Sequence, residues 1–339
     1  MRGKAPPPFP ADTAAHAPGL EYRRIPGAVP GLARAAETGH NARREADAMM
    51  YFKLALTALF WGGTFIAGRV LARDTPPFTA AFLRFCFALA ALAPILVRRR
   101  DLWPKGAGNF ALAAMLGATG VFGYNALFFW GLKSVAAGRA ALIVACNPVA
   151  ITVFSALFFG ERLRLAALAG VAVCLAGAAV VISRGDPQTL LTGAVGPGEA
   201  AIFGCVACWT SYTLIGKRAM ESMSPLAAVT LACALGAAFL LLPALGEGMA
   251  GLMPGFSPRQ WLALAYLGVC GTALGFIWYY QGIAAIGPAR SGVFINLVPV
   301  SAVAMGGLML GEKTDLSLVA GAALVLGGVW LTNRFRKRM

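Results

Sequence analysis

Ten apolar runs separated by short polar or charged segments dominate the pattern along this chain. They cover residues 51–71, 77–97, 109–130, 138–159, 166–183, 198–217, 225–245, 260–281, 288–310 and 316–333. Runs of about 18 to 23 residues can cross a hydrocarbon layer of roughly 30 Å as helices. Lipid offers no hydrogen-bond partners, so each backbone group must be satisfied inside the protein, as a helix does within one segment. The pattern predicts an all-α polytopic membrane protein with ten transmembrane helices.

The second half of the chain repeats the first. Residues 116–182 align with residues 267–333 at a constant offset of 151, and an earlier part aligns at an offset of 148. The matches include Gly117/Gly268, Gly120/Gly271, Gly131/Gly282, Arg139/Arg290, Pro148/Pro299, Gly160/Gly311, Glu161/Glu312, Gly170/Gly321 and Gly177/Gly328, and then Trp61/Trp209, Arg69/Lys217 and Pro77/Pro225. Internal repeats in a membrane chain are typical of secondary transporters.

The placement of charge predicts the orientation of the chain. The net charge is +15, and basic residues gather after the second, fourth, sixth and tenth runs. Loops rich in lysine and arginine remain in the cytoplasm, so both termini are predicted to be cytoplasmic. Each repeat then holds five runs, an odd number, and the second repeat must be inverted relative to the first. Because the charge lies next to apolar runs, we expect a bilayer rather than a nucleic acid as the partner.

These patterns divide the chain into five parts. They are a disordered N-terminal tail (1–48), a first repeat (49–184), a linker (185–194), a second repeat (195–333) and a basic cytoplasmic C-terminus (334–339). The tail has no continuous apolar segment of the kind found in secretory signals. It is either part of the native protein or an extension upstream of a start at Met49 or Met50, and we assign it no function.

The membrane body lacks the residues that several chemistries need. Both histidines, His16 and His40, lie in the tail, and no aspartate or glutamate lies deep in an apolar run. Cys205 and Cys208 form a CxxC motif without a second cysteine pair nearby, so we interpret them as small apolar residues. We predict no catalytic residue, no metal site, no cofactor and no enzymatic activity.

Polar and aromatic residues far from the ends of the runs are candidates for a transport path, because polar groups are costly in lipid. Arg84 matches an anionic substrate group, although a structural arginine bonded to carbonyls is the alternative. Asn147 precedes Pro148, where a kink would free carbonyls, although helix–helix hydrogen bonding is an equal alternative. The predicted substrate-binding residues are Trp61, Arg84, Tyr124, Asn125, Asn147, Trp209, Tyr212, Tyr279, Gln281 and Asn296.

The ends of two runs and the small faces of two others carry structural predictions. Glu161 and Glu312 each follow a glycine, and each is expected to complement the dipole of the next helix, with a gating contact as the alternative. The fifth and tenth runs are almost purely apolar and contain several glycines. Such faces favour helix packing or dimerisation over a polar path.

Four groups of residues together resemble a known family. They are Trp61-Gly62-Gly63-Thr64-Phe65, the segment Pro77 to Arg84, Asn147-Pro148 followed by Gly160-Glu161, and Pro299 followed by Gly311-Glu312. Over residues 51–333 the chain is similar to the EamA-domain family of the drug/metabolite transporter superfamily.

The resemblance implies an inner-membrane carrier with two inverted five-helix repeats and a central cavity lined by the first four helices of each repeat. It also implies export of amino acids, related metabolites or toxic compounds by alternating access. Expected partners are a small-molecule substrate, the lipid bilayer, protons as the coupling ion and a second copy in a homodimer. A membrane receptor or scaffold without transport is the alternative function.

Overall fold

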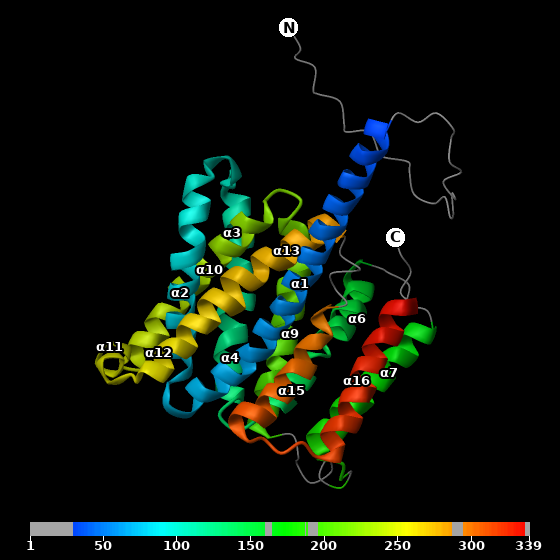
Figure 1. Cartoon of the computed structure of the whole chain (residues 1–339). Helices are drawn as coiled ribbons and strands as arrows, with labels where there is room; N and C mark the ends of the chain where they lie inside the picture. Colours follow the sequence, from blue (N-terminus) through cyan, green and yellow to red (C-terminus); the bar gives the residue numbers. More distant parts are fainter. Residues whose placement is uncertain (1–29, 160–164, 187, 189–195, 287–293, 336–339) are drawn as a thin grey trace. The chain divides into compact units, whose positions relative to one another are not determined.

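The computed structural model describes residues 30–159, 165–186, 188, 196–286 and 294–335, and these residues contain helices and no strand (Figure 1). Residues 1–46 and 47–339 form separate units, and the fold discussed below is that of the second unit. Several predictions fall outside the described residues, namely those on Glu161, Arg290, residues 1–29 of the tail, most of the linker and residues 336–339 of the basic C-terminus.

The helices follow the two halves of the sequence. The first half contains α1 (Pro30–Asp74), α2 (Pro77–Arg98), α3 (Ala107–Leu116), α4 (Tyr124–Gly131), α5 (Ala137–Val144), α6 (Asn147–Phe159) and α7 (Leu165–Ser183). The second half contains α9 (Pro197–Ala219), α10 (Pro225–Gly246), α11 (Met249–Leu252), α12 (Pro258–Ala265), α13 (Gly275–Ile286), α15 (Leu297–Leu310) and α16 (Leu316–Phe335). Short 3-10 turns cover Arg100–Leu102 and Met253–Gly255.

The described helices support a membrane protein, but they do not establish the predicted number of ten crossings. Seven are long and apolar enough to cross a membrane, and two more apolar helices, Leu297–Leu310 and Leu316–Thr332, are shorter. The 23-residue α9 is long enough but is not among the seven. The first helix also begins at Pro30, so part of the region predicted as a disordered tail is helical.

Both repeats interrupt their helices at equivalent places. A π-helical segment, η2 (Gly117–Gly123), joins α3 to α4, and a second one, η4 (Tyr266–Leu274), joins α12 to α13. The fourth helix of the first repeat breaks between α5 and α6, where Pro148 is the second residue of α6. Proline is tolerated there because a helix start needs no amide donor. Two duplicated pairs of glycines, Gly117/Gly268 and Gly120/Gly271, therefore lie in irregular segments of the helices.

The duplicated glycines also mark where the repeats touch. A Cβ atom on Gly117 would lie 2.7 Å from the amide nitrogen of Gly236 in α10, and one on Gly268 would lie 2.8 Å from that of Ala88 in α2. Gly236 and Ala88 are equivalent at the offset of 148. Each repeat thus presents a glycine of its third helix to the second helix of the other repeat, and any side chain there would force the backbones apart.

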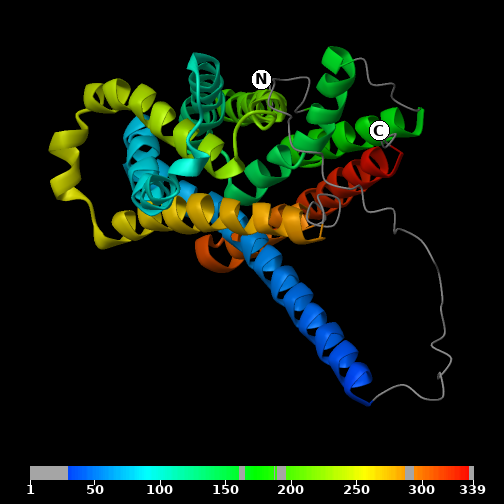
Figure 2. The same ribbon diagram turned by 90° about the horizontal axis from the view of Figure 1, so that it is seen from above.

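The fifth helix of each repeat packs against the other. A Cβ atom on Gly170 would lie 2.9 Å from the carbonyl oxygen of Gly328, and one on Gly321 would lie 3.0 Å from that of Gly177. The contact order runs in opposite directions along α7 and α16, so the two helices are antiparallel, as inverted repeats require. Figures 1 and 2 show them side by side. The glycine faces are used within the chain, which leaves the predicted homodimer without support from this feature.

The motif Trp61-Gly62-Gly63-Thr64 lets α1 approach the second repeat. A Cβ atom on Gly62 would meet the side chain of Ser301 in α15, and one on Gly63 would lie 2.9 Å from the Tyr266 ring. The Tyr266 hydroxyl donates to the carbonyl of Phe60 at 3.0 Å. The two glycines are therefore explained by packing between the repeats.

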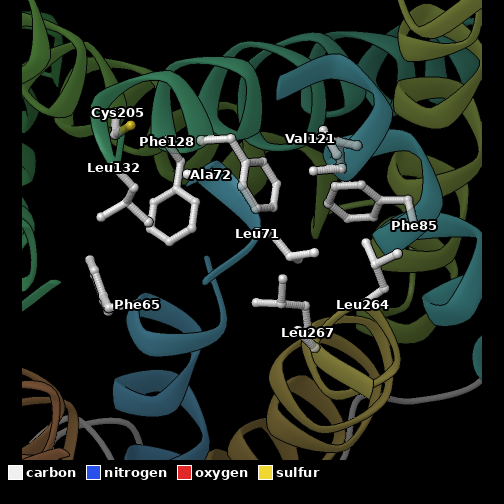
Figure 3. Close-up of a cluster of buried hydrophobic side chains, with 14 of the residues drawn as sticks. Phe65, Leu71, Ala72, Phe85, Val121, Phe128, Leu132, Cys205, Leu264 and Leu267 are labelled. Atoms are coloured by element: carbon white, nitrogen blue, oxygen red, sulfur yellow. The ribbon is translucent and has the colours of Figure 1, made fainter. Parts of the chain in front are cut away.

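A shared apolar core surrounds these contacts. In Figure 3, Phe65 and Phe128 lie close together on α1 and α4, and Leu264 and Leu267 approach from the second repeat. The rings of Phe65 and Phe128 meet edge to face, with centroids 5.4 Å apart. Lipid is as apolar as leucine, so close packing rather than escape from water holds such helices together.

Candidate functional site at Arg84

Arg84 is buried between the two repeats. It lies in α2, roughly 10 Å along the helix from Pro77, and is 9 % exposed. Its Nη1 donates to Oδ1 of Asn125 at 2.8 Å, and its Nη2 donates to Oγ1 of Thr272 at 3.2 Å. The guanidinium also lies over the ring of Phe85, with 5.4 Å between its carbon and the ring centroid. Arg84 thus connects its own repeat to the other one.

The two acceptors are oriented by the π-helical segments. The side-chain nitrogen Nδ2 of Asn125 donates to the carbonyls of Gly120 at 3.3 Å and Val121 at 2.8 Å, both in η2. The Thr272 hydroxyl donates to the carbonyl of Leu267 at 3.0 Å in η4. Because these donors are occupied, the oxygen of each side chain is left to accept from Arg84. π-Helical turns often occur at functional sites.

Aromatic rings line the same cavity as Arg84. Trp209 stacks on Tyr212 with ring centroids 5.3 Å apart, and its centroid lies 5.7 Å from that of Tyr124 and 6.3 Å from that of Phe276. These rings, Arg84, Asn125 and Thr272 line one cavity of about 50 Å³. That volume holds roughly one or two water molecules.

The cavity has one cationic side chain and no carboxylate among the described residues that line it. Arg84 forms no ion pair with a described residue, and its Nε has no hydrogen-bond partner among them. The repeat equivalent of Arg84 is Ala232, which lines the same cavity. Both repeats therefore contribute an equivalent position to the cavity, but only the first repeat contributes a charged side chain there.

The structure brings five of the ten predicted binding residues to this cavity. These are Arg84, Tyr124, Asn125, Trp209 and Tyr212. Thr272 and Phe276 were missed by the sequence analysis. Thr272 gave a weak signal, since a single hydroxyl after Gly271 is common in membrane helices, and Phe276 could not be told from the many other apolar residues of its run.

The other predicted binding residues lie outside the lining of this cavity. The Trp61 indole donates to the carbonyl of Gly271 at 3.0 Å, and its ring lies 5.3 Å from that of Tyr279. Gln281 is exposed and accepts from Lys53 at 3.4 Å. Asn147 is buried at the start of α6, and Asn296 is half-buried before α15. Their role in binding stays a prediction.

Glu312 caps a helix, but not the next helix that the sequence analysis predicted. Its carboxylate accepts from the amides of Ala137 at 2.8 Å and Gly138 at 3.1 Å, at the start of α5 in the other repeat. The start of α16 is capped instead by Asp315, which accepts from the amide of Leu318 at 2.8 Å. Glu312 thus complements a helix dipole as predicted, but the helix is α5 rather than α16, because tertiary contacts decide which helix end a loop carboxylate meets.

An ion pair lies beside this cap. Arg139 in α5 pairs with the carboxylate of Asp315. Hydrogen bonds from the hydroxyl of Ser317 and the amide of Leu318, together with Arg139, lower the pKa of Asp315. The carboxylate is therefore charged at neutral pH and links α5 to the loop before α16.

Replacing Glu312 by alanine is expected to lower the stability of the folded protein by about 0.5–2 kcal/mol, the usual effect of losing a helix N-terminal cap. The melting temperature in detergent measures this loss. Glu221→Ala is the matched control, because Glu221 is exposed and pairs with Arg218 three residues away on the surface. Equal melting temperatures for the two variants would show that the Glu312 contact contributes nothing to the fold.

Transporters built from internal repeats bind their substrates at the junction of the repeats, which is where Arg84 and its aromatic neighbours lie. The chain belongs to the EamA-like transporter family, whose profile matches residues 48–183 and 196–334.

Individual relatives agree with this assignment. The chain is 28 % identical to the uncharacterized transporter YyaM of Bacillus subtilis, over 83 % of this chain and 92 % of the relative. It is 32 % identical to a probable terminal-alkyne amino-acid exporter of Streptantibioticus cattleyicolor, again over 83 % and 92 %. A crystal structure of a protein superposes with a TM-score of 0.58 at 22 % identity, covering 85 % of this chain and 98 % of the other, which supports the fold alone.

Proposed function

We propose that this protein is a secondary transporter that exports small metabolites related to amino acids by alternating access. The observation that carries the proposal is the position of Arg84, a buried side chain that donates across the repeat interface in a cavity lined by aromatic rings. Transporters with internal repeats bind their cargo near the midplane, at the junction of the repeats. Movement of one repeat against the other would then expose this cavity to each side in turn.

The relatives support the kind of cargo. One of them is named as a probable exporter of an amino acid, and it shares 32 % of its aligned residues with this chain. Aromatic rings with one charged donor group suit the chemistry of an amphipathic molecule such as an amino acid. The proposal includes an inner-membrane location, which rests on the family resemblance, and cytoplasmic termini, which rest on the positive-inside rule. It also names protons as the coupling ion, on the strength of the family resemblance.

Counterflow in proteoliposomes tests the proposal. Vesicles loaded with an unlabelled amino acid are expected to take up the labelled compound transiently and saturably, whereas vesicles without the protein are not. The panel should include aromatic and aliphatic amino acids and their deaminated analogues. Saturable binding without protein-dependent flux for any compound would contradict transport and support a receptor or scaffold.

A further inference from the structure

We infer that the cargo of the Arg84 cavity carries a carboxylate, which pairs with the guanidinium, on an aromatic or bulky apolar body. This inference rests on the proposed function for the site and narrows its substrate class. The starting observation is a buried cation whose hydrogen-bond and ring partners among the described residues are an amide, a hydroxyl and an aromatic ring, none of which is charged.

The charge of Arg84 lacks a counter-ion among the described residues. Asn125 and Thr272 supply oxygen dipoles, which compensate a full charge only partly, and a buried charge is costly unless it is paired. Their two hydrogen bonds use two of the five N–H donors of the guanidinium, and the Nε donor has no partner among the described residues. An anion entering the cavity would complete both the charge balance and the hydrogen bonding.

The number of cations favours a carboxylate over a phosphate. Arg84 is the single cationic group among the described residues that line the cavity. A phosphate monoester approaches two negative charges and would leave part of its charge unpaired in a buried site. A carboxylate has one charge, and its planar pair of oxygens matches the fork of a guanidinium.

The aromatic residues that line the cavity indicate the chemistry of the rest of the cargo. Trp209, Tyr212 and Phe276 offer ring surface to an apolar body, and the ammonium of an amino acid would lie against these ring faces. The present cavity of about 50 Å³ is too small for such a molecule, so binding requires it to widen. If Nη2 of Arg84 donates to the carboxylate of the cargo instead of to Thr272, its hydrogen bond to the second repeat is lost. Binding would then loosen the contact between the repeats and allow the cavity to widen.

Paired ligands that differ only at the acid group test the inference. The probes are 3-phenylpropionate, its amide and phenethyl phosphate, together with phenylalanine and phenylalaninamide. Binding is measured on the detergent-solubilised full chain by tryptophan fluorescence and by the shift in melting temperature. Each carboxylate is expected to bind at least about 10-fold more tightly than its amide, because hydrogen bonds to a charged group are worth that factor or more.

Two variants assign the preference to Arg84. Arg84→Gln is expected to bind acid and amide equally, whereas Arg218→Gln, which removes an exposed positive charge elsewhere, is expected to keep the wild-type preference. If Arg84→Gln does not fold, the ligand pairs on the wild-type protein still decide the question. Equal binding of acid and amide, tighter binding of the phosphate, no binding of any carboxylate, or a preference that survives Arg84→Gln would each overturn the inference.

Parallel flux measurements separate this inference from the proposed function. Flux of amides or amines without flux of carboxylates would support the transport function and overturn the inference of a carboxylate cargo. Carboxylate-selective binding without flux of any probe would support the role of Arg84 and contradict the proposed transport function.

Discussion

Gly328→Val is expected to lower the melting temperature strongly, whereas Gly327→Val, one position earlier, is expected to leave it nearly unchanged. A Cβ atom on Gly328 would lie 2.7 Å from the Cα atom of Cys174 in α7, so the two backbones would have to separate. A Cβ atom on Gly327 would meet nothing within 4 Å. The two substitutions change helix propensity alike, and they differ in whether a neighbouring helix blocks the new side chain.

The size of this effect follows from the cost of overpacking. Forcing extra methyl groups into a closely packed interface costs about 1–3 kcal/mol, occasionally more. At the upper end, ~3 kcal/mol corresponds to a fall in melting temperature of roughly 6 to 12 °C, on the scaling known for soluble domains. Thermal unfolding in one detergent, with both variants purified in parallel, measures the difference. Similar melting temperatures for the two would show that α7 and α16 do not pack through their glycines.

The roles of the glycines could be predicted from the sequence only in part. The duplicated glycines predicted two repeats, and the periodicity predicted membrane helices with small packing faces. Neither could show that Gly120 would face Tyr212 while its equivalent Gly271 faces Thr64, because such contacts depend on how the repeats dock. Tyr212 and Thr64 are themselves equivalent at the offset of 148, so the two glycines make reciprocal contacts across one interface between the repeats.

The candidate site was predicted less completely than the fold, for a physical reason. Intramembrane polarity identified Arg84 and Asn125 but gave equal weight to Gln281, which lies exposed beside Lys53. Polarity shows that a side chain needs a partner, and the partner is set by tertiary structure. Thr272 shows the converse, since its hydroxyl completes the link to Arg84 although threonine is only weakly polar.

Asn125→Asp is expected to give a folded protein that binds carboxylates about 10- to 150-fold more weakly than wild type. Oδ1 of Asn125 lies 2.8 Å from Nη1 of Arg84, so an aspartate there would be ionised beside the guanidinium and would supply the missing counter-ion from within the chain. A carboxylate cargo would then have to displace an internal ion pair. The factor corresponds to about 1.5–3 kcal/mol, the usual strength of hydrogen bonds to charged groups.

Asn125→Leu is the control that separates charge from orientation. Both substitutions remove the hydrogen bonds from the Asn125 amide to Gly120 and Val121, and only the aspartate adds a negative charge. We therefore expect the leucine variant to keep its preference for carboxylate over amide and the aspartate variant to lose it, with melting temperatures recorded for both. Carboxylate binding by Asn125→Asp at the wild-type level would mean that the cargo does not pair with Arg84, and the buried guanidinium would then serve only to join the two repeats.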